Sequence, residues 1–113
     1  MATKDKIVYL YGFSTTMESK LTNLIQIIEN HLEQNTHISI VFIHDGVIGT
    51  SQKSRKSHAL KKLLNLPLVF YTMIPDLKAR GIGTQNLQPK FTSINYDELV
   101  DILAEAPKIV SWM

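Results

Sequence analysis

The side chains best suited to chemistry follow two hydrophobic runs of this 113-residue chain. One run ends in the sequence His-Asp-Gly-Val at residues 44–47, and the other leads into residues 73–82, which read Met-Ile-Pro-Asp-Leu-Lys-Ala-Arg-Gly-Ile. In open α/β sheets, polar residues just past the carboxyl ends of strands face the crevice where ligands and partners bind. The sequence therefore predicts that function lies at these two segments.

Each segment has a chemical and a structural interpretation. His44 and Asp45 could form an acid–base pair or bind a metal ion. Neighbouring strand residues point to opposite faces, however, so we expect a turn facing the cleft rather than two converging side chains. Asp76 and Arg80 have the four-residue spacing of an ion pair within one helix. The alternative is that both line a subunit interface.

A third candidate is a run of cations. It comprises Lys53, Arg55, Lys56, Lys61 and Lys62, five of the 12 fixed positive charges of a chain whose net charge is only +2. Clustered lysine and arginine on one helix face is typical of contact with RNA phosphates. No aromatic residue is interleaved to stack on bases. An acidic partner protein fits equally well, and a solvated helix face is the simplest interpretation.

A fourth candidate is the loop that follows the first hydrophobic run, and its polar members are Gly12, Ser14, Thr15 and Thr16. Backbone N–H groups and hydroxyls at a helix start could hold a phosphate. This would make the chain a homo-oligomeric module that binds a small anion. Thr15 and Glu18 also have the spacing of a capping box, which explains the hydroxyl without any ligand.

Composition excludes several classes of protein. The chain contains no cysteine, which rules out disulfides, thiolate metal sites and a cysteine nucleophile. Hydrophobic residues make up 44% and charged residues 19%, as in an ordinary globular protein. No apolar run approaches the roughly 20 residues that span a bilayer, and the first ten residues do not read as a signal peptide. We therefore expect a cytoplasmic protein without a membrane partner.

The two strand-end motifs resemble the DsrE/DsrF/DsrH family of sulfur-relay proteins, most closely its DsrH/TusB branch. That branch reads Asp-Gly-Val after one strand and Asp-Leu-x-Ala-Arg-Gly-hydrophobic after the next, as residues 45–47 and 76–82 do here. The resemblance runs from about Val41 to the C-terminus. It includes an aspartate-rich last helix and a terminal tryptophan, Trp112.

The resemblance implies a role without catalysis. Catalytic members of the family carry sulfur as a persulfide on a strand-end cysteine just upstream of an Arg-Gly pair, and Met73 would occupy that vestigial position. A thioether cannot form a persulfide, because its sulfur already carries two carbon substituents. The implied cleft or interface comprises His44, Asp45, Gly46, Ile74, Pro75, Asp76, Arg80, Gly81 and Trp112.

The resemblance also implies partners and a pathway. The partners would be DsrE/DsrF-like (TusC/TusD-like) subunits or further copies of this chain, together with a sulfur-carrier protein, and no cofactor. The outlet would be 2-thiolation of the wobble uridine in tRNA or, alternatively, dissimilatory sulfur oxidation. We expect Met73, Ile74 and Trp112 to leave apolar surface in the cleft and so to favour association.

The elements that must position these residues follow from the hydrophobic pattern. Strands are predicted at residues 7–11, 38–43, 68–74 and 91–94, with a fifth strand or an extended tail at 108–112. Helices are predicted at residues 17–34 and 54–64, in a short segment that begins near Pro75 and ends near Gly81, and after an Asn95–Glu98 capping box. This alternation predicts one three-layer α/β/α domain over residues 1–113, with about five mostly parallel strands.

Overall fold

The computed structural model describes residues 6–34, 36–52 and 57–112, whose strands form one five-stranded sheet. In chain order the strands are β1 (Lys6–Tyr11), β2 (His37–Phe42), β3 (Val69–Met73), β4 (Phe91–Ile94) and β5 (Lys108–Trp112). Their order across the sheet is β4-β3-β2-β1-β5, and every neighbouring pair is parallel. Residues 108–112 are therefore a fifth strand and not a free tail.

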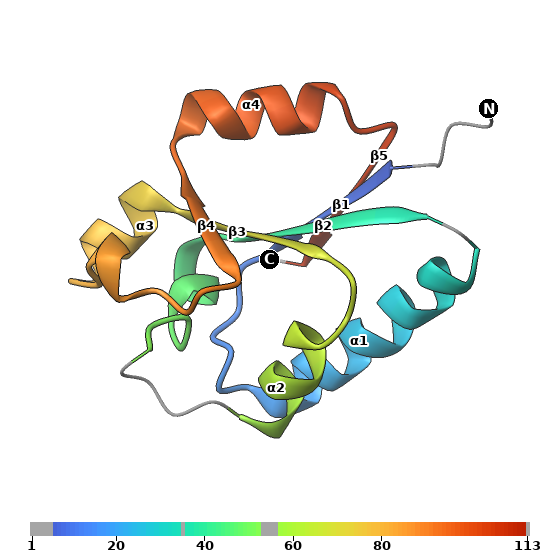
Figure 1. Cartoon of the computed structure of the whole chain (residues 1–113), viewed down its shortest axis with the longest axis horizontal. Coiled ribbons are helices and arrows are strands. Elements are labelled where there is room, and N and C mark those ends of the chain that lie inside the picture. The colour runs from blue at the N-terminus through green and yellow to red at the C-terminus, as the bar shows by residue number, and fades with distance from the viewer. Residues whose placement is uncertain (1–5, 35, 53–56, 113) are drawn as a thin grey trace.

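Helices cover both faces of this sheet. They are α1 (Glu18–Glu33), α2 (His58–Leu64), α3 (Ile74–Ala79) and α4 (Tyr96–Ala104), with 3-10 turns η1 (His44–Val47) and η2 (Thr84–Asn86). Figure 1 shows α4 on one side of the sheet and α1 with α2 on the other. The predicted three-layer α/β/α arrangement is confirmed. In the part of the chain that the structure describes, no helix is long and apolar enough to cross a membrane.

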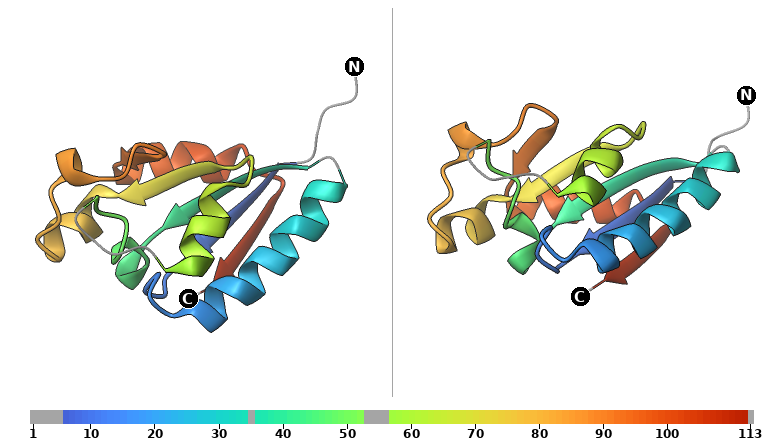
Figure 2. Two further views of the ribbon diagram at one scale, coloured as in Figure 1. Left: turned by 60° about the horizontal axis from the view of Figure 1, so that its bottom comes forward. Right: turned by 90° about the horizontal axis from the view of Figure 1, so that it is seen from below.

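The two faces of the sheet are buried to different extents. The larger hydrophobic cluster lies under α1 and α2, which pack side by side in both views of Figure 2. The smaller cluster lies under α4, and its buried members are Val8, Val41, Ile43, Met73 and Ile94. Helix α4 has no fully buried residue, and Tyr96 and Val100 on it are 60% and 63% exposed. Helix α4 therefore buries fewer side chains against the sheet than α1 and α2 do.

The structure shows whether the two predicted capping boxes form at the N-termini of α4 and α1. The Asn95 side chain accepts a hydrogen bond from the Glu98 N–H at 2.8 Å, and the Glu98 carboxylate accepts from the Asn95 N–H at 3.2 Å. The Thr15–Glu18 box is wrong. The Thr15 hydroxyl donates to the Ile48 carbonyl at 2.6 Å, and the Glu18 carboxylate accepts from the N–H of His58, the first residue of α2. Both side chains thus connect different elements of the fold.

Helix α2 is shorter than predicted. It begins at His58 rather than Ser54, and the Ser57 hydroxyl caps it by accepting from the Leu60 N–H at 3.1 Å. Its predicted apolar face is confirmed, since Leu60, Leu63 and Leu64 are buried. Residues 53–56, which hold three of the five clustered cations, lie outside the described residues.

Candidate functional site

The turn after β2 depends on one glycine. His44 adopts a left-handed backbone conformation with φ of 50°, and residues 44–47 turn into η1 instead of extending β2. A Cβ on Gly46 would lie 2.2 Å from the Tyr11 carbonyl oxygen, far closer than van der Waals contact. Glycine at this position therefore allows η1 to pack against the end of β1.

Helix α3 follows β3 without a loop, and its two ends match the prediction. Pro75 lies in the first turn, where its missing N–H costs no hydrogen bond. Gly81 has φ of 68° and donates its N–H to the Lys78 carbonyl, while the Ile82 N–H donates to the Leu77 carbonyl at 2.9 Å. These two bonds form a Schellman motif. Together with the fully buried Leu77, they fix α3 against the sheet.

Four charged or ionisable side chains meet where η1 faces α3, and we call His44, Asp45, Asp76 and Arg80 the strand-end cluster. The Arg80 guanidinium donates to one Asp45 carboxylate oxygen from Nη2 at 2.9 Å and from Nε at 3.3 Å. Its Nη1 lies 3.8 Å from the Asp76 carboxylate. The His44 Nδ1 lies 3.9 Å from the same Asp76 oxygen. Arg80 therefore links two segments that are distant in sequence.

The cluster corrects one prediction and extends another. His44 and Asp45 do reach the same set of charges, because both lie in a 3-10 turn and not in a strand with alternating faces. The predicted Asp76–Arg80 pair exists, but Arg80 makes its shorter contact with Asp45. The sequence carried no signal for that contact, because it depends on β2 and β3 being neighbours in the sheet.

The chemistry available to the cluster is limited. Its carboxylates are paired with Arg80, and no cysteine exists in the chain to serve as a nucleophile. Among the described residues, no three histidine or acidic side chains gather closely enough to hold a metal ion. The side chains of His44 and Asp45 are 64% and 62% exposed. These two side chains are therefore accessible to another molecule.

Other predicted site residues lie apart from the cluster. Trp112 is half-buried at the end of β5, packs against the core under α1 and α2, and accepts a hydrogen bond from the Gly12 N–H at 2.8 Å. Strand β1 lies between β5 and β2, so Trp112 is roughly 10 Å from the η1 side of the sheet at ordinary strand spacing. Trp112 thus shares the carboxyl end of the sheet with the cluster but lies two strands away from β2.

The loop at residues 12–16 has little capacity left for an anion. The Thr15 N–H donates to the Ile48 carbonyl, and the Met17 N–H donates to the Ser14 carbonyl. The Thr16 N–H donates to the Ser14 hydroxyl, whose oxygen also lies 2.8 Å from the Thr16 hydroxyl. Several of its N–H groups and hydroxyls are thus bonded within the protein, as a structural role of the loop requires.

Two of the predicted cations are described, and both are exposed on α2. The Lys62 ammonium lies 3.7 Å from the Glu29 carboxylate of α1. Lys61 lines a cavity of about 470 Å³ together with Leu64, Asn65, Gln88, Pro89 and Lys90. The contribution of Lys53, Arg55 and Lys56 lies outside the described residues.

Comparison with known proteins assigns the family. The family model described as "DsrH like protein" matches residues 14–109, which is most of the chain. The chain belongs to the DsrH-like family. Two curated relatives carry the name Protein TusB. The one from Erwinia tasmaniensis is 29% identical over 73 residues, covering 65% of this chain and 73% of its own length. The one from Pectobacterium atrosepticum is 30% identical over 74 residues, covering 66% and 74%.

Solved structures agree with the fold of this DsrH-like protein. A protein of unknown function from Methanobacterium thermoautotrophicum, MTH1491, superimposes with a TM-score of 0.77 at 18% identity, covering 96% of this chain and 99% of its own. The ychN protein from E. coli superimposes with a TM-score of 0.72 at 20% identity and the same coverage. The resemblance to the DsrH/TusB branch of the sulfur-relay proteins, recognised from the strand-end motifs, is therefore confirmed.

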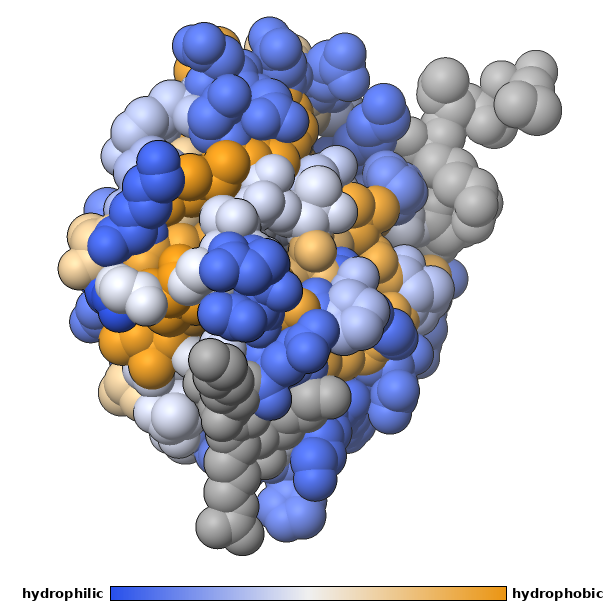
Figure 3. Space-filling model, turned by 60° about the vertical axis from the view of Figure 1, so that its left-hand side comes forward, coloured by the Kyte–Doolittle hydropathy of each residue, from blue (hydrophilic) through white to orange (hydrophobic). Residues whose placement is uncertain are grey.

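The environment of Met73 differs from the sequence expectation. Its side chain is 1% exposed and packs with Ile43 and Ile94 in the cluster under α4, so it leaves no apolar surface in a cleft. The reason is that Met73 points to the α4 face of the sheet. Ile74 is half-buried, and Ile48, just after η1, is 37% exposed. On the molecular face brought forward in Figure 3, hydrophobic surface lies between hydrophilic side chains.

Proposed function

We propose that this DsrH-like chain is a non-catalytic subunit of a cytoplasmic sulfur-relay complex that supplies 2-thiolation of the wobble uridine in tRNA. The observation that carries the proposal is a DsrH-like match over residues 14–109 in a chain without cysteine. The TusB name of the curated relatives favours tRNA thiolation over dissimilatory sulfur oxidation. Met73 stands in place of the thiol, so persulfide chemistry belongs to a partner.

The docking surface in this proposal is the carboxyl end of the sheet. The strand-end cluster offers exposed polar groups held in place by Arg80, and Ile48 and Ile74 add apolar area beside it. A mixed surface of this kind, with a few apolar anchors inside a polar rim, is typical of protein interfaces. The partners we propose are DsrE/DsrF-like (TusC/TusD-like) subunits, and self-association is the alternative.

The assembly is tested by expressing the chain alone and together with cysteine-bearing DsrE/DsrF-like subunits from the same genome. We expect a complex in size-exclusion chromatography with light scattering. Replacing Ile74 by Asp should shift it toward free subunits, because a carboxylate is costly to bury in an interface. Replacing the exposed Ile27 of α1 by Asp is the matched control and should leave the complex intact. A chain that stays monomeric and ignores these subunits contradicts the proposal.

The sulfur chemistry is tested by incubation with a cysteine desulfurase and labelled cysteine. This chain alone should acquire no stable label, whereas the assembled complex should be labelled on its cysteine-bearing subunits. Deleting the gene should then lower the 2-thiouridine content of tRNA. Unchanged 2-thiouridine with impaired oxidation of reduced sulfur would instead assign the chain to the dissimilatory pathway.

A further inference from the structure

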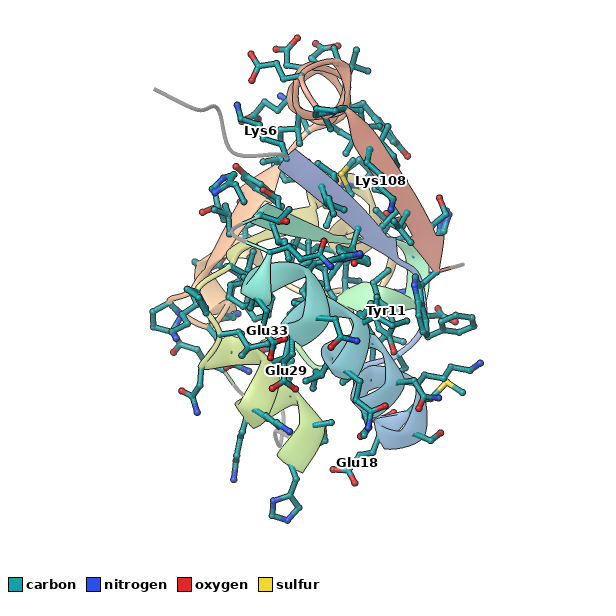
Figure 4. All side chains as sticks on the ribbon, turned by 90° about the vertical axis from the view of Figure 1, so that its right-hand side faces the viewer. Lys6, Tyr11, Glu18, Glu29, Glu33 and Lys108 are labelled. Carbon is teal, nitrogen blue, oxygen red and sulfur yellow. The ribbon has the colours of Figure 1, made fainter. Side chains whose placement is uncertain are left out.

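Strand β5 forms one edge of the sheet, because β1 is the only described strand that pairs with it. Figure 4 shows β5 along the outer side of β1, with Lys108 labelled at its start. Three of its five side chains are exposed, among them Ile109 at 45%. The opposite edge strand, β4, has four residues and buries Phe91 and Ile94. The more exposed edge of this sheet is therefore β5.

Alternate residues of β5 direct their backbone groups toward β1 and away from it. The Gly12 N–H donates to the Trp112 carbonyl at 2.8 Å, so the Trp112 carbonyl faces β1. In a parallel ladder every second residue bonds to the same neighbouring strand, which leaves the N–H and C=O groups of Ile109 and Ser111 directed outward. Among the described residues, no bond from another segment reaches these groups. The edge therefore presents two N–H and two C=O groups to another molecule.

Protection against edge pairing is found only at the start of β5. Natural edge strands are commonly blunted by proline or lysine, and Pro107 and Lys108 are of these kinds. The residues that follow, at positions 109–112, include no charge and no proline. In a monomer, water bonds the free backbone groups of this segment.

The pattern of free groups is self-complementary. When two β5 strands run antiparallel about a two-fold axis, Ile109 of one copy can face Ser111 of the other. Two outward-facing residues in this position exchange two hydrogen bonds. The axis repeats the pair, so all the free groups of both strands are used. A register centred on Ile109 would instead place Ser111 opposite Pro107, which has no N–H to donate.

The side chains also match in this register. On the face of the sheet that α1 covers, Val110 meets Val110 of the second copy. Lys108 lies on the same face, since it pairs with the core residue Ile7, and it meets Trp112 of the second copy. The two lysines are thus kept apart, and each ammonium lies beside an indole, the ring that suits a cation best. On the α4 face, the two Ile109 side chains are diagonal neighbours and cover each other.

We propose that β5 is an interaction surface for a second copy of this chain, which it joins as an antiparallel strand pair centred on Val110. The two sheets then form one continuous sheet across the two-fold axis. Strand pairing alone makes a small interface, of the weak class that buries less than about 1,200 Å². The inference goes beyond the proposed function, whose docking surface is the strand-end cluster with Ile48 and Ile74.

The register is tested by disulfide cross-linking of the full chain, which has no cysteine of its own. Val110 and its counterpart form a non-hydrogen-bonded pair with Cα atoms about 4.5 Å apart, within disulfide range. Val110→Cys should therefore give a covalent dimer at least about tenfold faster than Ser111→Cys, whose diagonal separation of about 7–8 Å is too large. Lys78→Cys, at an exposed position of α3, is the matched control and should also react slowly.

The hydrogen bonds are tested by Ser111→Pro. This change removes an outward N–H that β1 does not use, and proline is tolerated on the outer side of an edge strand. Ser111→Ala keeps that N–H and is the matched control. In sedimentation equilibrium up to about 0.5 mM, where a weak dimer is populated, wild type and Ser111→Ala should dimerise alike. Ser111→Pro should raise the dissociation constant at least about tenfold, because the dimer loses two hydrogen bonds.

Ile109→Lys is a second edge variant, and it should weaken the dimer because two ammonium groups become diagonal neighbours. The amide NMR spectrum of each variant shows whether its fold is intact. Ile74→Asp should leave this dimer unchanged, which separates a failure here from a failure of the proposed function. The inference is overturned if wild type stays monomeric, if Ser111→Cys or Lys78→Cys cross-links as fast as Val110→Cys, or if folded Ser111→Pro and Ile109→Lys dimerise like wild type.

Discussion

The charged side chains at the two ends of the parallel sheet differ in how they are paired. At the carboxyl end, Arg80 contacts two carboxylates and His44 lies near one of them, so each carboxylate of the cluster has a basic neighbour within the protein. At the amino end, Lys6, Lys108 and His31 share a cavity without a carboxylate among its lining residues. Paired charges at the carboxyl end hold η1 and α3 together. At the amino end, no ion pair among the described residues includes Lys6 or Lys108.

The largest expected effect on stability comes from a substitution at the carboxyl end of the sheet, where Gly46 packs against the end of β1. Gly46→Ala should lower the free energy of unfolding by about 3 kcal/mol, because its Cβ would overlap the Tyr11 carbonyl oxygen and push η1 away. Gly81→Ala is the matched control. A Cβ there meets nothing within 4 Å, so only the left-handed backbone conformation is penalised, by about 1–2 kcal/mol. Urea unfolding measures both, and equal losses would contradict the steric explanation.

Alkaline pH should lower the free energy of unfolding, because strand β1 carries two buried tyrosines, Tyr9 and Tyr11. Burial raises the pKa of Tyr9 and of Tyr11 from 10.0 to about 12. Between these pH values the unfolded chain loses both protons and the folded chain keeps them. Stability is therefore unaffected well below pH 10 and falls as the pH approaches and passes it, by about 2 kcal/mol from pH 10 to pH 11. Urea unfolding across this window should show the decline, and either Tyr→Phe variant should roughly halve it.

At neutral pH, the Tyr→Phe variants of the same two residues should differ in stability. Tyr9→Phe removes the hydrogen bond to His31 and should cost about 1 kcal/mol. The Tyr11 hydroxyl is buried and has no partner among the described residues, so Tyr11→Phe should be neutral or stabilising by about 1 kcal/mol. Thermal and urea unfolding of the pair check this. Equal destabilisation would mean that the Tyr9–His31 bond adds nothing.

The smallest effect on stability is expected at the exposed lysines of α2. Lys61→Glu with Lys62→Glu should change the free energy of unfolding by less than about 1 kcal/mol, since exposed ion pairs contribute little. If this face contacts RNA or an acidic partner, the double variant should weaken that association, and wild-type binding should fall with added salt. Unchanged binding in a filter or polarisation assay would leave α2 as a solvated face.

Much of the fold followed from local sequence. Continuous apolar runs with Gly, Pro or Asp at their ends define strands β1 to β4 to within one residue at each end. The Asn95–Glu98 box, Pro75 and Gly81 also behave as predicted. Each of these features involves groups within a few residues of one another. The family followed as well, because its motifs are short contiguous segments at the ends of strands.

The candidate site was predicted only in part. The segments around His44 and Asp76 were correctly expected to lie at strand ends, but the contact between Asp45 and Arg80 depends on strand order. Thr15 was assigned to a cap because a hydroxyl near a helix start usually serves one, yet the Ile48 carbonyl is the acceptor that the fold brings to it. Met73 was expected to be exposed and is buried by the α4 layer.

The sequence by itself determined the elements, the absence of thiol chemistry and the family of this protein. Tertiary structure alone decided which charges are paired. A hydrogen bond or ion pair forms with whichever group the packing of the strands places within about 3 Å. Residues 108–112 were predicted as a strand or an extended tail, and only their pairing with β1 decides which of their backbone groups are bonded within the sheet.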